Sequence, residues 1–133
     1  MVIDSSALVA ILFGEPGADS FVDAIAAATP RLLSAASLLE AAIVVDNQMG
    51  PAAGRQLDRF VEQARIRIEP VTEAQVRIAR QAYVDFGRGN HGAKLNFGDC
   101  FAYALAKATG EPLLFKREDF EQTDIRAYRS PGS

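Results

Sequence analysis

The sequence predicts an α/β domain with a mostly parallel central sheet and helices on both faces. Three observations lead to this fold class. Short apolar runs alternate along the chain with longer segments whose apolar residues recur every three or four positions, the spacing of a helix face. Several connections between the apolar runs hold two such helical segments, and crossovers of this length are typical of parallel strands. Some runs lack polar alternation, which favours strands covered on both faces.

Composition agrees with a single globular domain over residues 1–133. The chain is 49% hydrophobic and 23% charged, with a net charge of −3. Cys100 is the single cysteine, so no disulfide can form within the chain, which fits a reducing compartment. Asp4 lies in the first apolar run without a basic segment before it, which argues against a signal peptide. No apolar run is long enough for a membrane span, and we expect a cytoplasmic protein.

The first strand is expected over residues 1–3 and ends at Asp4. Ser5 and Ser6 are candidate N-caps for a helix over residues 7–13, because a serine hydroxyl accepts from the free N–H groups of a first turn. An acid that closes an apolar strand needs a partner, and with two serines available for capping, Asp4 is predicted to serve a site instead.

After Gly14 a second helix is expected, then a strand over residues 32–33 and a helix from Ser34 or Ser37 to Met49. The residues of this third helix that we expect to face inward are Leu38, Leu39, Ala42 and Ile43. Glu40 lies in its first turns among these apolar neighbours, so a fully exposed position for its side chain is not expected.

A fourth helix is expected to begin at Pro51, followed by a strand over residues 66–69. Thr72 and Gln75 form a capping box for a helix that ends near Asp85. A glycine-rich stretch with basic residues follows and is expected to be a mobile loop.

Residues 95–107, LNFGDCFAYALAK, form the most informative segment. It has no charge between Asp99 and Lys107, which predicts a helix buried on all sides. Taken alone, Asp99 could simply close a capping box with Asn96. Gly110 ends this helix, a strand follows over residues 113–115, and the tail from about residue 126 is expected to fray.

Four acids follow predicted strands or open the central helix: Asp4, Glu40, Asp99 and Asp119. In an open parallel sheet these positions share the crevice at the carboxyl ends of the strands, where ligands bind. Four neighbouring carboxylates stay ionised only with a compensating cation, and oxygen ligands suit Mg²⁺ or Mn²⁺. With one histidine and one cysteine, the chain does not readily form a Ser-His-Asp or Cys-His catalytic arrangement. The reaction that we expect is therefore metal-assisted hydrolysis of a phosphodiester.

Four motifs in order, MVIDSSAL, SLLE, LNFGDCFAYALAK and PLLFKREDFEQTDI, resemble those of PIN domains of the VapC toxin type over nearly the whole chain. The resemblance implies a three-layer α/β/α PIN-like fold and a Mg²⁺- or Mn²⁺-dependent endoribonuclease, the toxin of a type II toxin–antitoxin pair. It also implies a homodimer and inhibition by a cognate VapB-type antitoxin. It carries Asp4, Glu40, Asp99 and Asp119 over as the acidic site, with Asp4 and Asp99 as metal ligands. Arg117 departs from the pattern, since many members have glycine there.

Two other functions fit parts of the sequence. A PIN-like module could bind RNA or a protein without cutting, but an idle acidic cluster would cost stability. A phosphotransfer domain of receiver type also places acids at strand ends and a lysine, here Lys116, after a late strand. The present sequence, however, lacks the pair of adjacent acids expected early in a receiver domain. Metal-dependent RNA cleavage by the pure protein separates the three.

Substrate-binding cations are expected in the second half of the chain. Residues 1–64 hold eight acids and three bases, whereas residues 65–133 hold nine acids and eleven bases. Arg88, Lys94 and Lys116 lie close in sequence to the predicted site, and backbone phosphates of RNA need such cations. His91 in the same loop is interpreted as a solvated residue.

Overall fold

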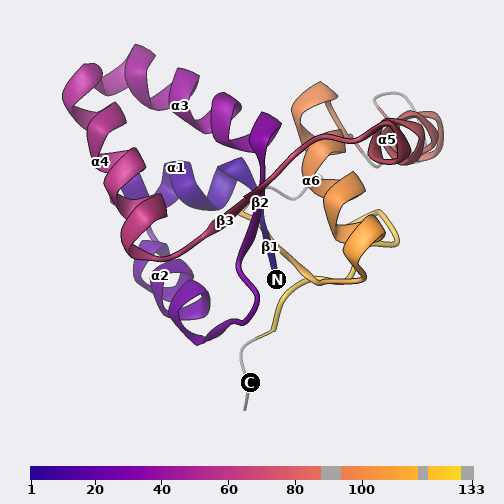
Figure 1. The fold of residues 1–133 in the computed structure, drawn as a ribbon, viewed down its shortest axis with the longest axis horizontal. Coiled ribbons are helices and arrows are strands. Elements are labelled where there is room, and N and C mark those ends of the chain that lie inside the picture. Colours follow the sequence, from indigo (N-terminus) through magenta and orange to yellow (C-terminus); the bar gives the residue numbers. More distant parts are fainter. Residues whose placement is uncertain (88–93, 117–119, 130–133) are drawn as a thin grey trace.

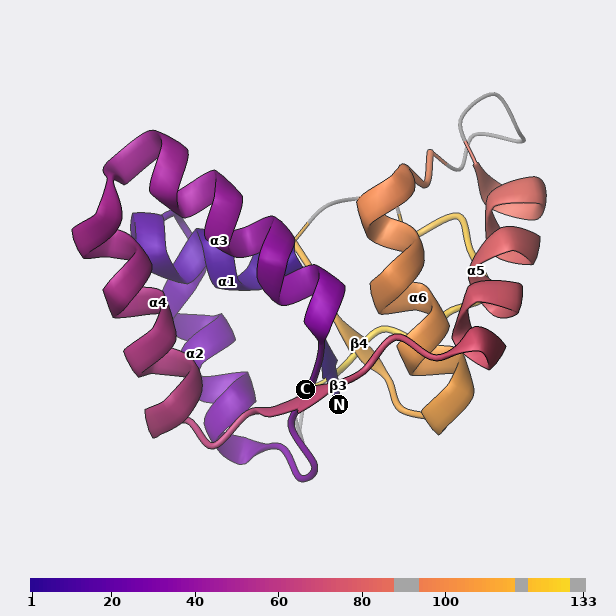
Figure 2. The ribbon, with the colours of Figure 1, turned by 45° about the horizontal axis from the view of Figure 1, so that its top comes forward.

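A computed structural model describes residues 1–87, 94–116 and 120–129 of the chain. Figure 1 shows a small central sheet between two groups of helices, and Figure 2 shows the same two groups from a second direction. The strands are β1 (Val2–Ile3), β2 (Leu32–Ser34), β3 (Arg67–Glu69) and β4 (Leu113–Leu114). They lie in the order β3-β2-β1-β4, and every pair is parallel. The predicted α/β class and parallel sheet are confirmed.

The strand order places a topological switch beside β1. The chain moves from β1 to β2 and β3 on one side, and β4 then pairs with β1 on the other, with Val2 opposite both Leu32 and Leu113. In open α/β sheets, ligands bind outside the carboxyl ends of the strands at such a point. We call this end of the sheet the carboxyl edge. Asp4 lies directly on it.

The helices form two layers, one on each face of the sheet. On one face lie α1 (Ser5–Phe13), α2 (Ala18–Ala27), α3 (Ala35–Met49) and α4 (Pro51–Gln63). The other face carries α5 (Glu73–Phe86) and α6 (Phe97–Thr109). Within the described residues, no helix is both long enough and apolar enough to cross a bilayer.

Each face of the sheet has its own hydrophobic core, because successive side chains of a strand point to opposite faces. Ile3, Leu33 and Leu114 pack with the α1–α4 layer. Val2, Leu32 and Leu113, their immediate neighbours, pack with α5 and α6. Both residues of each pair are buried, which explains why these strands are apolar throughout.

The central helix α6 begins and ends where the sequence predicts. Asn96 is its N-cap, and Gly110 ends it with a positive φ of 73°, a conformation that glycine adopts without strain. Residues 102–106 are all buried. The prediction that the helix is buried on all sides is wrong at its first turn, because Phe97 is 78% exposed.

Two apolar residues of α3 also face solvent rather than the core. Leu39 is 61% exposed and Ile43 is 50% exposed, so the prediction that both face inward is wrong. Ala41 and Val45 take the buried stripe instead. The helix has apolar residues on more than one side, but only one side faces the core. Leu39 and Ile43 lie on another side.

The C-terminal segment is attached to the sheet beyond residue 126. Leu113 donates its backbone N–H to the carbonyl of Arg126 and accepts from the N–H of Tyr128, both over 2.9 Å. Asp124 anchors the same segment by an ion pair with Lys107 over 2.6 Å and by accepting from the hydroxyl of Tyr103. The prediction that the tail frays from about residue 126 is therefore wrong for residues 126–128.

Candidate active site

Asp4 is fully buried at the carboxyl end of β1, with an exposed fraction of 0%. It is the N-cap of α1, and its Oδ2 accepts from the backbone N–H of Ser6 over 3.0 Å. The prediction that Ser5 or Ser6 caps this helix is wrong, since the helix begins at Ser5 and the acid itself takes the cap position. The side chains of both serines are thereby available for contacts with distant parts of the chain.

Asp99 is buried in the first turn of α6, with an exposed fraction of 1%. Its Oδ2 accepts from the backbone N–H of Asn96 over 3.0 Å, while Asn96 Oδ1 accepts from the N–H of Asp99 over 2.9 Å. The predicted capping box is therefore present. The positive end of the helix dipole also favours the ionised carboxylate at this position.

Glu40 connects the other two acids through their sequence neighbours. Ser5, which follows Asp4, donates its hydroxyl to Oε1 of Glu40. Oε2 of the same carboxylate lies so close to Gly98, which precedes Asp99, that a Cβ on that glycine would stand 1.9 Å from it. The carboxylate of Glu40 thus lies between the first turns of α1 and α6. The structure brings the neighbourhoods of Asp4, Glu40 and Asp99 together at the carboxyl edge.

The chain after β4 is attached to the same place. Ser6 Oγ accepts from the backbone N–H of Lys116 over 2.9 Å. The side chain of Lys116, predicted as a substrate-binding cation, forms a partly exposed ion pair with Glu15. Asp119 and Arg117 follow within three residues but lie outside the described residues, as do Arg88 and His91. Lys94 is described and exposed, two residues before the cap of α6.

The donor set at this edge suits a hard divalent cation in its chemistry. Over residues 1–87, 94–116 and 120–129, no three histidine, cysteine, aspartate or glutamate side chains are grouped closely enough to hold a metal ion. Magnesium sites, however, commonly use only one or two carboxylates together with waters and substrate phosphates. Asp4 and Asp99 are two buried carboxylates from different elements at one edge, and they fit that requirement.

Cys100 is not an available nucleophile, although it follows Asp99. Burial, together with the negative charge of Asp99, raises the pKa of its thiol to about 11. Its sulfur also donates to the carbonyl of Asn96 over 3.3 Å. A thiol in this state reacts slowly at neutral pH. Covalent catalysis through Cys100 is therefore not supported.

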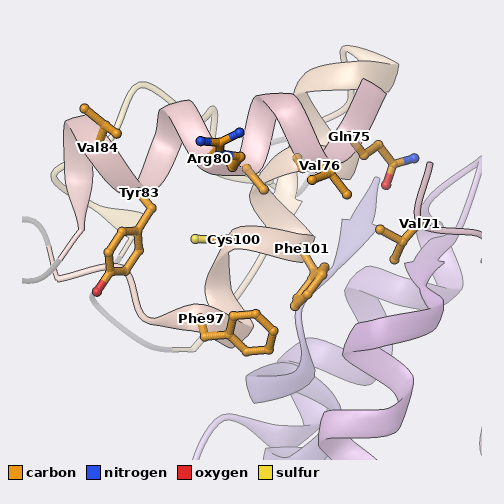
Figure 3. A pocket seen from close by; sticks show the side chains of 11 residues that line it. Val71, Gln75, Val76, Arg80, Tyr83, Val84, Phe97, Cys100 and Phe101 are labelled. Atoms are coloured by element: carbon orange, nitrogen blue, oxygen red, sulfur yellow. The ribbon is translucent and has the colours of Figure 1, made fainter. Parts of the chain in front are cut away.

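A hollow of about 650 Å³ lies between α5 and α6. Figure 3 shows Tyr83 and Val76 of α5 and Phe97 and Phe101 of α6 around it. The rings of Phe97 and Phe101 meet edge to face, with centroids 5.0 Å apart. We call this feature the α5–α6 groove; its lining residues are Val71, Gln75, Val76, Ala79, Arg80, Tyr83, Val84, Phe97, Cys100, Phe101 and Ala104. An exposed apolar surface of this kind often marks an interaction site.

Two residues at this edge, Ser5 and Gly98, are not among the site residues predicted from the sequence. The sequence predicts only a capping role for Ser5. Its contact with Glu40 joins residues 35 positions apart, and no local pattern reveals such a contact. Gly98 did leave a signal. It is a glycine within an otherwise strong helix sequence, where alanine would be favoured unless space is required.

Comparisons with known proteins agree with this architecture. The family profile of the PIN domain matches residues 1–126. Ribonuclease VapC28 of Mycobacterium tuberculosis is 53% identical over 127 residues, which are 95% of this chain and 96% of that protein. Ribonuclease VapC30 of the same species is 49% identical over 131 residues, or 98% and 100% of the two chains. Ribonuclease VapC of Mycolicibacterium smegmatis is 50% identical over 127 residues, or 96% and 98%.

A solved structure gives the same result for the fold. The crystal structure of VapC20 of Mycobacterium tuberculosis, described as a sarcin-ricin loop cleaving toxin, superposes with a TM-score of 0.78. It covers 97% of this chain and 98% of that protein at 19% identity, which supports the fold alone. The family match and the curated relatives span nearly the whole chain. The chain therefore belongs to the PIN domain family, and it is a ribonuclease of the VapC toxin type that hydrolyses RNA.

Proposed function

We propose that RNA cleavage by this toxin depends on Mg²⁺ or Mn²⁺ held by Asp4 and Asp99. The observation that carries the proposal is the burial of both acids at the carboxyl edge, with exposed fractions of 0% and 1%. Buried carboxylates are costly unless positive charge compensates them, and carboxylate oxygens are preferred ligands of these ions. When bound, the metal supplies a Lewis acid that polarises a phosphate oxygen and lowers the pKa of a water.

The remaining chemistry is assigned to the protein's own acids. Glu40 orients the attacking water and accepts its proton as general base, with Asp119 as the alternative base. Glu40 is partly exposed, and its carboxylate lies between the two helix ends that carry Asp4 and Asp99. From this position it can contact a water molecule from solvent. Asp119 completes the acidic set by its position in the fourth motif. No protein nucleophile takes part.

Asp99→Asn tests this assignment. Asparagine keeps an oxygen that accepts from Asn96, so the cap of α6 is retained while one buried charge is removed. Cleavage should fall by about 100-fold or more, and Mn²⁺ binding by titration calorimetry should weaken. The thermal midpoint in metal-free buffer should be equal or higher, because like-charge repulsion is relieved.

The matched control is Asp58→Asn, the same change at an exposed position of α4. It should leave cleavage, Mn²⁺ binding and the thermal midpoint unaltered. Full nuclease activity in purified Asp99→Asn protein would overturn the assignment. Cleavage that persists after removal of divalent ions with EDTA would overturn the metal requirement.

For partners, we propose a homodimer that forms through the α5–α6 groove. Phe97, Tyr83 and Val84 present apolar surface to solvent there, and burial in a second copy would remove it from water. Phe97, which lines the groove, directly precedes Gly98 in α6. Such a dimer would therefore place the acidic sites of both protomers near its interface.

We also propose inhibition by a cognate VapB-type antitoxin. A segment of the antitoxin would lie along apolar surface of the toxin's helices, and an arginine could reach the carboxylates at the carboxyl edge. The proposed location is the cytoplasm, which suits a chain whose single thiol is free and buried.

A further inference from the structure

The carboxylate of Glu40 is confined from two sides by residues that carry no charge. Ser5 donates its hydroxyl to Oε1 from the first turn of α1. On the opposite side, a Cβ built on Gly98 would stand 1.9 Å from Oε2 and 2.6 Å from Cδ. Real Cβ atoms do not approach other heavy atoms this closely. The carboxylate therefore occupies the space that any side chain at position 98 would need.

The backbone gives no other reason for glycine at position 98. Its φ is not positive, unlike those of Gly14, Gly17, Gly50 and Gly110. It lies in the first turn of α6, where alanine is the better helix former. A glycine at this position reduces helix propensity, and what it provides is room for the carboxylate of Glu40.

We propose that Gly98 and Ser5 are positioning residues for Glu40. Together they set where its carboxylate stands relative to Asp4 and Asp99, Ser5 through a hydrogen bond and Gly98 through the absence of a side chain. The inference rests on the proposed function, in which Glu40 orients the attacking water. It adds two residues that contact neither the metal nor the RNA in that function.

The geometry predicts an effect on catalysis with little effect on folding. Gly98→Ala would push against the end of a flexible, partly exposed side chain rather than against backbone. Glu40 can rotate away, so the fold is retained. A general base displaced by about 1 Å can lower the rate by roughly 100-fold. The value of kcat should therefore fall by about 10- to 100-fold, while KM for RNA stays unchanged because binding groups are untouched.

The matched control is Gly54→Ala in α4. A Cβ there would stand 2.1 Å from Oδ1 of Asp46, so the same substitution also displaces the end of an acidic side chain. Asp46 is exposed at the far end of α3 from Glu40. Gly54→Ala should leave kcat and KM unchanged. The pair separates displacement of Glu40 from the general effect of alanine for glycine in a helix.

The experiment compares wild type with Gly98→Ala, Ser5→Ala, the double variant, Gly54→Ala and Glu40→Gln. Single-turnover rates and KM are measured with one RNA substrate, and Mn²⁺ affinity and thermal midpoints are measured separately. Gly98→Ala and Ser5→Ala should each lower kcat with unchanged Mn²⁺ affinity. The losses in the double variant should not multiply, because both act through one carboxylate. Gly98→Ala should keep or raise the thermal midpoint in metal-free buffer.

The outcomes separate the role of Glu40 from the positioning roles of Gly98 and Ser5. Wild-type activity in Glu40→Gln would show that the proposed function assigns Glu40 wrongly. An inactive Glu40→Gln with unchanged kcat in both Gly98→Ala and Ser5→Ala would overturn the positioning role alone. If Gly98→Ala does not fold, Ser5→Ala decides, since it removes one hydroxyl and introduces no atom that could clash.

Discussion

Lys116 donates its backbone N–H to the hydroxyl oxygen of Ser6, over 2.9 Å and across 110 positions of sequence. The bond attaches the chain that leaves β4 to the first turn of α1, next to Asp4. The fourth predicted acid, Asp119, follows three residues later. Ser6 therefore connects the first and last motifs of the PIN domain at the carboxyl edge.

Ser6→Ala should destabilise the protein and slow cleavage by more than the loss of stability explains. One hydrogen bond in a buried setting contributes about 1 kcal/mol, which urea unfolding measures. Ser37→Ala is a suitable control because Ser37 is equally buried, and its hydroxyl has no hydrogen-bond partner among the described residues. That substitution should be neutral or stabilising. Equal stability losses in the two variants would contradict the role given to Ser6.

The sequence predicts the parts of this structure that depend on local patterns. The strands follow from short apolar runs, and the cap at Asn96 and the helix end at Gly110 follow from capping preferences; all are confirmed. The exposed side of a helix is different. Leu39 and Phe97 lie in segments apolar on several sides, so periodicity cannot tell which side meets the core.

The details of the acidic site depend on contacts between residues distant in sequence. Ser5, Ser6 and Asp4 have similar preference for an N-cap, and local chemistry does not choose among them. Contacts with distant residues decide which of them caps the helix. Ser5 donates its hydroxyl to Glu40, and the hydroxyl of Ser6 accepts from the backbone N–H of Lys116 after β4. The motifs predict which acids form the site, whereas the contacts of Ser5 and Ser6 can be seen only in the fold.

Asp124 should contribute stability that depends on pH. Burial raises the pKa of its carboxyl, but hydrogen bonds from Lys107 and Tyr103 outweigh burial and hold the pKa below its usual value. The contribution is therefore fully present above the carboxyl pKa of the unfolded chain, about 3.9, and is lost as pH falls through the lower value of the folded state.

Comparison with Asp124→Asn tests this titration. The variant should be less stable than wild type at pH 7, and the difference should shrink as the pH is lowered below about 4. Glu73→Gln serves as control, because the ion pair of Glu73 with Arg77 is exposed and should contribute little at any pH. Urea midpoints over a pH series measure both. A difference between wild type and Asp124→Asn that grows toward low pH would contradict the sign.

Phe97→Ser should weaken the proposed homodimer without unfolding the protomer. Phe97 is 78% exposed, so its replacement costs the isolated chain little. If the α5–α6 groove is the interface, loss of its burial should weaken association by about 2 kcal/mol, roughly 30-fold in Kd. Light scattering across micromolar concentrations measures the change. Val22→Ser, an exposed apolar position of α2 on the other layer, should leave association unaltered. A monomeric wild type at these concentrations would argue against the dimer.

Arg88 and Lys94 should hold the RNA that an acidic site would otherwise repel. Lys94 is exposed just before the cap of α6, and Arg88 precedes it in a glycine-rich stretch outside the described residues. Each phosphate contact contributes about one unit to the slope of log affinity against log salt concentration. The double variant with alanine at both positions should therefore bind RNA more weakly, with a slope flatter by about two units. Mn²⁺ affinity and thermal stability should not change.

The control for this experiment removes the same number of charges from α4, by Arg55→Ala and Arg59→Ala. Both arginines are exposed, and α4 belongs to the layer on the other face of the sheet from α6. Net charge changes equally in the two double variants, so a general electrostatic effect would lower RNA affinity in both. A local contact predicts a flatter salt slope only when Arg88 and Lys94 are replaced. An unaltered slope in that variant would show that the RNA is held elsewhere. Lys116 would then be the next residue to replace, in a variant that also lacks its ion-pair partner Glu15.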